Sequence, residues 1–198
     1  MDDESRPGAT CSATEIVTSW LPGAFAAAQR RPSPDSPTVR LSLSGEGGGE
    51  WDLCATKQEL HVSAREPGWR RGRETNEPGI WLRQNTSDFL ALLRGDPDLP
   101  ALLPPQIGIM SLLCIDDNQM ALLNDINGRL KIEIEGRRRR RWAMDVAFGP
   151  AGVRAGHPRS TVRVDSRTCE DLSSGAIVVM QALMSGRLRV EGDRGLAM

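Results

Sequence analysis

The sequence lacks most of the features that would assign a function at once. Its 198 residues contain no apolar run near the length of about 20 residues that a membrane helix needs. The four cysteines are spread along the chain without a Cys-x-x-Cys pair or a neighbouring histidine, which argues against a zinc site. Of these, Cys54 and Cys169 are interpreted as small core hydrophobes. The N-terminus is acidic and polar, unlike a signal peptide, and the composition is rich in arginine, alanine and glycine, so we expect a cytoplasmic bacterial protein.

Motifs that mark an active site are also missing. There is no Gly-x-Ser-x-Gly elbow, phosphate-binding loop or Gly-x-Gly-x-x-Gly turn. His157 lies in a Gly-His-Pro turn and His61 in an alternating segment, where such side chains are mostly solvated. The adjacent carboxylates of Glu170 and Asp171 point in different directions on a helix, so they make a poor acid–base pair. The residues therefore make no positive case for an enzyme, and they indicate no cofactor or metal.

What the sequence does contain is a distinctive C-terminal segment at residues 182–198. An apolar stretch is followed by a Ser-Gly break, a short alternating strand and a Gly-rich turn, which opens into a new apolar segment. In the strand, three charged residues alternate with Leu188 and Val190. This pattern predicts a strand with one solvated face and one buried face.

The segment resembles the C-terminal signature of the sterol carrier protein 2 (SCP2) family, in which a Met-Gln/Ser-Gly-Lys/Arg strand precedes Gly-Asp-x-Gly-Leu-Ala-Met. Proteins of this family have a five-stranded sheet covered by helices, with a hydrophobic tunnel between them for fatty acids, acyl-CoA, sterols or similar molecules. The resemblance therefore implies an α+β fold whose sheet is covered by helices on one face. It also implies a ligand-binding role for Met180, Gln181, Leu183, Met184, Leu188, Leu196 and Met198. For any single one of them a plain core role is the alternative, and Gln181 either orients a headgroup or caps a helix.

The sequence also predicts that the chain contains the same unit twice. Residues 80–95 align with residues 160–175, and each segment predicts a short strand, a polar helix start and a helix closed by glycine, Gly95 or Gly175. The first copy resembles the SCP2 family through its Asn-x-x-Asp-Phe-x-x-Leu-x-x-Gly pattern. Because it lacks the later Gly-Asp-x-Gly glycines, we interpret it as the degenerate copy.

The alignment extends in both directions. Upstream, Trp51 corresponds to Trp142, and downstream, residues 112–121 echo residues 188–197. The spacing between these landmarks gives the first unit about eleven extra residues, which we assign to a polar loop at 65–79.

These patterns predict a disordered N-terminus at 1–13, a degenerate SCP2-like unit at 14–126 and a second unit at 127–198. The second unit lacks a long N-terminal helix and the final C-terminal helix of the family. A helix shared between the units predicts an integrated pseudo-dimer. The elements expected are a helix over 14–29 that kinks or splits at 21–23, a hairpin of 39–43 with 51–56, a buried strand over 107–115, a helix over 118–126 and a strand over 129–135.

Five consecutive arginines, Arg137, Arg138, Arg139, Arg140 and Arg141, lie in the hairpin turn of the second unit. One interpretation is a solvated turn, because like charges repel and need water. The other is a docking patch for anionic lipid headgroups or a phosphate-bearing acyl carrier, since each basic residue near an anionic membrane contributes about 1 kcal/mol. Nucleic-acid binding is less favoured, because the run has no interleaved aromatic residues and the formal net charge is only −1.

Three functions stay open. The resemblance favours non-covalent binding, and transfer, of lipids or other hydrophobic small molecules, such as fatty acyl or sterol compounds, in an apolar tunnel. The alternatives are a small secondary-metabolism enzyme that uses the tunnel as a reaction chamber, and an accessory or dimerisation module without a ligand. The expected partner is a hydrophobic small molecule or lipid, with an anionic membrane surface and a homodimer left open.

Overall fold

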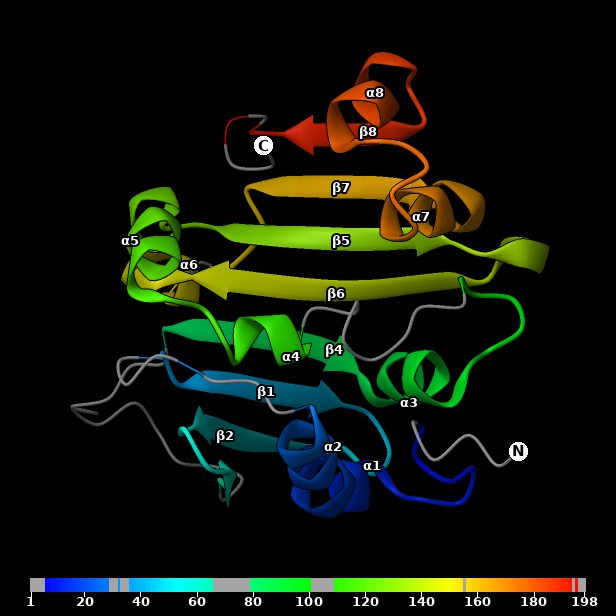
Figure 1. The fold of residues 1–198 in the computed structure, drawn as a ribbon. Helices are drawn as coiled ribbons and strands as arrows, with labels where there is room; N and C mark the ends of the chain where they lie inside the picture. Colours follow the sequence, from blue (N-terminus) through cyan, green and yellow to red (C-terminus); the bar gives the residue numbers. More distant parts are fainter. Residues whose placement is uncertain are drawn as a thin grey trace.

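One mixed sheet of eight strands, with helices packed on it, organises the protein (Figure 1). The structure, a computed structural model, describes residues 6–28, 32, 36–65, 79–100, 109–154, 156–193 and 195. The strands are β1 (Val39–Ser44), β2 (Gly49–Ala55), β3 (Leu60–Ala64), β4 (Ile80–Asn85), β5 (Arg129–Glu135), β6 (Arg141–Phe148), β7 (Ser160–Asp165) and β8 (Leu188–Gly192). They lie in the order β3-β2-β1-β4-β6-β5-β7-β8.

The helical segments lie at the N-terminus and between the strands. They are α1 (Ala13–Glu15), η1 (Ile16–Trp20), α2 (Leu21–Ala27), α3 (Thr86–Arg94), α4 (Ile109–Leu112), α5 (Asp117–Ile126), η3 (Arg137–Arg139), α6 (Gly149–Arg154), α7 (Ser166–Ser173) and α8 (Val179–Met184). No described helix has both the length and the hydropathy to cross a bilayer.

The N-terminal helix does not split at its proline, contrary to one of the two predicted outcomes. The chain is helical from α1 through η1 to α2, and η1 has the wide π-helical pattern. The amide of Leu21 donates to the carbonyl of Ile16, and Pro22 follows in the first turn of α2. Pro22 is thus the second residue of α2, directly after the π-helical turns, and the helix continues through it.

Both aligned segments, 80–95 and 160–175, contain the predicted strand and helix. β4 runs directly into α3 and β7 into α7, and the two strands begin 80 residues apart in the sequence. Asn85 caps α3 by accepting from the amide of Ser87, and Asp165 caps α7 by accepting from the amide of Thr168. Gly95 then closes α3 with a left-handed φ of 84°. The predicted hairpin, the helix near 118–126 and the strand 129–135 are also present.

The pairing pattern recurs along the sheet. β1 pairs antiparallel with β2 and parallel with β4, while β5 pairs antiparallel with β6 and parallel with β7. Leu41 lies opposite Leu82 in the first parallel pair, and Ile132 lies opposite Val162 in the second. Counted from the strand–helix junctions, these two pairs occupy equivalent register positions. The pairing of β4 with β6 joins everything into one sheet.

The strand predicted at 107–115 is wrong. Residues 109–112 form helix α4, and 107–108 lie outside the described residues. A further strand of the first half would pair with the edge of β4, but β6 occupies that edge. The expected echo of residues 188–197 in 112–121 is therefore wrong as well, since a turn and the start of α5 lie there.

The proposed tryptophan equivalence is shifted by two residues. Trp51 lies opposite Leu41 of β1, whereas Trp142 lies opposite Ile134 of β5, two positions beyond the counterpart of Leu41. The sequence alignment assigns the extra residues of the first half to a loop. Part of the difference between the halves is instead strand β3, because the second half has helix α6 after the corresponding strand. Most of the predicted loop, 66–78, lies outside the described residues.

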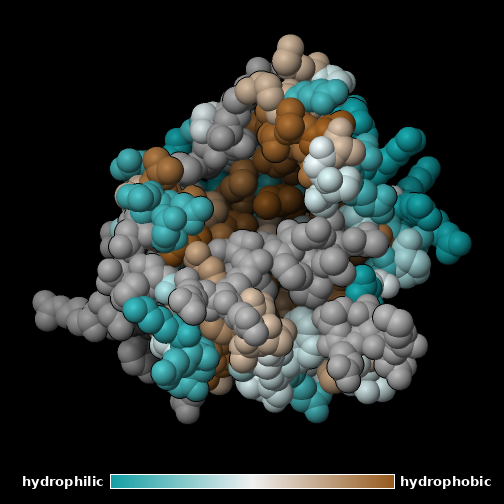
Figure 2. Space-filling model, in the orientation of Figure 1, coloured by the Kyte–Doolittle hydropathy of each residue, from teal (hydrophilic) through white to brown (hydrophobic). Residues whose placement is uncertain are grey.

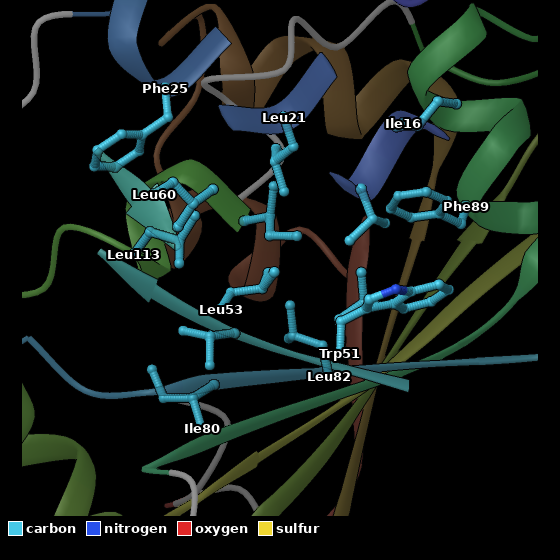
Figure 3. Packing of buried hydrophobic residues seen from close by; sticks show 14 of the residues in the cluster. Ile16, Leu21, Phe25, Trp51, Leu53, Leu60, Ile80, Leu82, Phe89 and Leu113 are labelled. Atoms are coloured by element: carbon cyan, nitrogen blue, oxygen red, sulfur yellow. The ribbon is translucent and has the colours of Figure 1, made fainter. Parts of the chain in front are cut away.

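The main hydrophobic core lies between the N-terminal helices and the first half of the sheet. Figure 3 shows the side chains of Ile16 and Leu21 pointing from the helices toward Trp51 and Leu82 on the strands. Cys54 is exposed, contrary to prediction, because the alternation in β2 turns its neighbours into the core and Cys54 away from it.

Candidate functional site

The helix-facing side of the sheet is closed in its first half. Leu53 is fully buried, Leu41 and Leu82 are each 2% exposed, and helices α1 to α4 contribute to the same core. There is no room for a ligand at these positions, since protein interiors pack at the density of organic crystals.

The same side is open over the second half. Met144 of β6, Ile132 of β5, Val162 of β7 and Val190 of β8 form one row across the sheet. All four are only half-buried. Figure 2 shows a hollow lined by apolar residues over the middle of these strands. We call this feature, with the four residues as its floor, the apolar hollow.

A smaller hydrophobic cluster holds α3 and α7 beside the apolar hollow. It contains Ile134, Trp142 and Val164 of the strands, with Cys169 and Leu172 of α7 partly buried against it. Burial raises the pKa of the Cys169 thiol from 9.0 to about 11, so this sulfur is an uncharged apolar neighbour. This outcome agrees with the core role predicted for Cys169.

The structure divides the predicted ligand-binding residues between two environments. Leu188 is 9% exposed at the start of β8, and Leu183 is half-buried on α8. Gln181 is exposed, Met180 is 52% exposed and Met184 is 85% exposed. The sequence also proposed Leu196 and Met198, which lie outside the described residues. The short helix α8 therefore turns Ala182, which is fully buried, toward the protein and its methionines outward.

The row of side chains that forms the floor of the apolar hollow continues to Gln84 of β4, which the sequence analysis did not single out. Met144 lies opposite Gln84 of β4, which is 8% exposed. Its side-chain Nε2 has no hydrogen-bond partner in the part of the chain that the structure describes. The signal was present, because a glutamine follows Ile80 and Leu82 in an alternating strand, on the buried face.

The arginine run forms a 3₁₀ turn, and its members differ. Arg137, Arg138, Arg139 and Arg141 are exposed, whereas Arg140 is half-buried. The guanidinium of Arg140 lies 2.7 Å from a carboxylate oxygen of Asp88 and 3.4 Å from one of Asp96. Arg140 therefore ties the turn to helix α3 and its C-terminal loop, which leaves the other four arginines for any surface contact.

The opposite side of the sheet is polar in both halves. Asp52 accepts from Arg40 at 2.7 Å and from Arg65 at 2.8 Å, and the guanidinium of Arg83 stacks on the ring of Trp81 at 3.5 Å. An open groove of about 740 Å³ is lined mostly by charged and polar residues, and Leu43, Gln84 and Met144 also contribute to its lining. Such a surface suits water and ions more than an apolar ligand.

The described residues bring no metal-binding group together. Among them, no cluster of three or more histidine, cysteine, aspartate or glutamate side chains is placed to hold a metal ion. The apolar hollow, with its neighbouring amide, is the feature of the described structure that best fits a small molecule.

Comparison with known proteins connects this half of the sheet to a family. Residues 110–198 match the SCP-2 sterol transfer family. The matched SCP2 segment contains β5 to β8 and thus the whole floor of the apolar hollow. No match is found among curated proteins.

Solved SCP2 structures resemble part of the chain. Sterol carrier protein 2 of Yarrowia lipolytica in its apo form is 15% identical, over 41% of this chain and 75% of that chain, with a TM-score of 0.33. The sterol carrier protein domain 2 of Helicoverpa armigera is 18% identical, over 42% and 68%, with a TM-score of 0.32. Palmitated SCP2L2 of Aedes aegypti is 25% identical, over 35% and 65%, with a TM-score of 0.28.

Proposed function

We propose that the C-terminal half of this protein binds a lipid or another hydrophobic small molecule non-covalently in the apolar hollow. The observation that carries the proposal is the row of four half-buried apolar side chains, in the segment that matches the SCP-2 sterol transfer family. Covering such side chains is favourable, at about 25 cal/mol for each Å² of apolar surface removed from water. Exchange of the ligand with membranes would make the protein a carrier.

We also propose that the chain consists of two SCP2-like units, at 14–126 and 127–198, of which the second is the working one. The recurring strand pairings and the matching helix starts support this history. In the first unit, Leu41 and Leu82 fill the place that the hollow occupies in the second. The expected stoichiometry is therefore one ligand per chain.

Among the sequence-predicted ligand residues, Leu183 and Leu188 are the ones we retain at the wall of the site. We assign Met180, Gln181 and Met184 to the outer side of α8, where they would contact a ligand only on its way in. Val178, Val179, Met180 and Met184 are all more than half exposed. An apolar surface of this kind suits contact with a membrane or with a second protein chain.

Native mass spectrometry of the purified protein, followed by organic extraction, tests the proposal first. We expect a copurifying hydrophobic molecule at about one per chain, or uptake of an added fluorescent fatty acid or sterol. A protein that carries nothing and ignores both probes would instead favour the accessory or dimerisation role. Turnover of a bound molecule would favour the enzyme that the sequence left open.

A pair of variants places the ligand. Val162→Trp fills the floor of the apolar hollow, and we expect it to weaken probe binding by at least tenfold. Thr161→Trp is the matched control, because the neighbouring side chain of β7 lies on the opposite face of the sheet. Equal losses in both variants, or no loss in Val162→Trp with the fold intact, would remove the ligand from the hollow.

A further inference from the structure

Gln84 is an unusual residue in the helix-facing side of the sheet. It is 8% exposed, and its Nε2 has no hydrogen-bond partner among the described residues. Buried side-chain polar groups are nearly always hydrogen-bonded, because a buried donor left without an acceptor destabilises the folded protein. The position has no need of a polar residue for folding, since its counterpart in the second half is the buried Val164.

Gln84 lies at one end of the row of apolar side chains that forms the floor of the hollow. Gln84 lies opposite Leu43 on one side and Met144 on the other. From Met144 the row continues over Ile132 and Val162 to Val190. A buried amide donor thus stands at one end of an apolar row four strand spacings long, or about 19 Å at the usual spacing of about 4.8 Å.

We propose that the ligand of the apolar hollow is an elongated hydrophobe with one uncharged oxygen acceptor, which receives a hydrogen bond from Nε2 of Gln84. This inference rests on the proposed function and specifies its ligand. The apolar chain lies along the row toward Val190, and the ester, ketone or ether oxygen lies at the Gln84 end. Met144 stands between Gln84 and the hollow, and its flexible thioether side chain moves aside or packs on the ligand.

The charges around the row favour an uncharged acceptor over a carboxylate. In β5 to β8 the charged side chains alternate with the apolar ones and lie on the opposite face, where Arg163 pairs with Glu133. The first charged side chain that follows Gln84 in the chain is acidic, since Asp88 accepts from the amide of Ala143 and pairs with Arg140. Arg83, which precedes Gln84, points to the opposite face and stacks on Trp81. A carboxylate beside Gln84 would be a buried charge without a cation from these strands, which is far costlier than a neutral oxygen.

The test compares three competitors that share a 16-carbon chain, hexadecane, methyl palmitate and palmitate, for displacement of a bound fluorescent probe at neutral pH. For the wild type we expect methyl palmitate to bind about tenfold more tightly than hexadecane, and palmitate to bind no more tightly than the ester. In Gln84→Met, which keeps the shape of the side chain but removes the donor, the preference for the ester disappears while the affinity for hexadecane is unchanged. The same substitution raises the Tm of the unliganded protein, because an unsatisfied buried donor is gone.

Two results would overturn the assignment of Gln84 while leaving the proposed function standing. One is an ester preference that persists in Gln84→Met, and the other is tighter binding of palmitate than of methyl palmitate. In both cases hexadecane still binds to the wild type, and Val162→Trp still weakens its binding by at least tenfold. Failure of all three competitors in the wild type would overturn the proposed function together with this inference.

Discussion

The two halves of the sheet present the same kind of apolar face and cover it differently. Over β1, β2 and β4 the N-terminal helices bury Leu41 and Leu82 almost completely. At the equivalent positions over β5 and β7, Ile132 and Val162 are half-buried. The difference lies in the covering helices, since the second half has no described counterpart of the long α1–η1–α2 segment.

Under the proposed function, this comparison separates a structural half from a ligand-binding half. A covered apolar face contributes its full burial to folding stability, whereas a half-covered face leaves part of that free energy to a ligand. A protein that binds an apolar molecule must keep such a face open, and it must gain its stability elsewhere. Here the first half supplies the larger core.

The largest effect is expected from truncating equivalent residues in the two halves. Leu41→Ala leaves a cavity in a closed core and should lower the free energy of unfolding by about 3 kcal/mol. Ile132→Ala removes a half-buried side chain and should lower it by about 1 kcal/mol. Urea denaturation of both variants measures the difference. Equal losses would mean that the hollow is as tightly packed as the first core, and would contradict the difference in packing between the two halves.

Thiol labelling gives the next largest effect. The pKa of Cys169 is raised from 9.0 to about 11. At about pH 8 its thiolate fraction is therefore roughly a hundredfold lower than that of a thiol with the ordinary pKa of 9.0. Cys54 is exposed on the first half and serves as the internal reference. Peptide mapping after iodoacetamide treatment should show rapid labelling of Cys54 and slow labelling of Cys169. Comparable rates would place Cys169 in water, outside the cluster that holds α7 beside the apolar hollow.

Local order was largely predictable from the sequence. The alignment of 80–95 with 160–175 gave the starts of both strand–helix segments, because the helix caps and closing glycines are signals confined to a few neighbouring residues. The turn from α5 into β5 was predictable for the same reason, since Asn127 takes a left-handed φ of 42° as the cap of α5.

The errors came from pairing over long distances. No short stretch of sequence indicates that β6 pairs with the edge of β4. Because it does, a strand at 107–115 has no free edge to pair with. The exposure of Met184 is a similar case, because a methionine in an apolar stretch has the same local pattern whether the helix turns it inward or outward. The alternation of β4 places Gln84 on the buried face, but only the packed structure shows that its Nε2 has no hydrogen-bond partner among the described residues.

A smaller effect is expected from the arginine turn. Arg140→Gln removes the contacts with Asp88 and Asp96 and should lower the free energy of unfolding by about 1 kcal/mol, whereas Arg139→Gln should leave it unchanged. Cosedimentation with anionic vesicles tests whether this turn also docks on membranes. Replacing the exposed arginines together should reduce vesicle binding if the turn docks on membranes. Unchanged cosedimentation would leave only the tie to α3.

The smallest effect concerns the polar side of the sheet, where the two halves should behave alike. Partial burial raises the pKa of Asp52, but the hydrogen bonds from Arg40 and Arg65 lower it by more, so it lies below its ordinary value. The pKa of Glu133 is also lowered, chiefly by hydrogen bonds from Arg163 and Lys131. A carboxylate with a lowered pKa stabilises the folded state above its unfolded pKa of about 4 and loses that contribution as the pH falls through its folded pKa.

Asp52→Asn and Glu133→Gln should therefore both lower the Tm near neutral pH, by a few degrees at most because the pairs are partly solvated. In each case the difference from the wild type should shrink below about pH 4, where the wild-type carboxylate becomes protonated. Thermal unfolding between neutral and acidic pH measures both curves. Similar curves would confine the difference between the halves to the side that the helices cover. A much larger loss in Glu133→Gln would mean that the open half depends on its ion pairs for stability, and that its hollow is held in shape from the polar side.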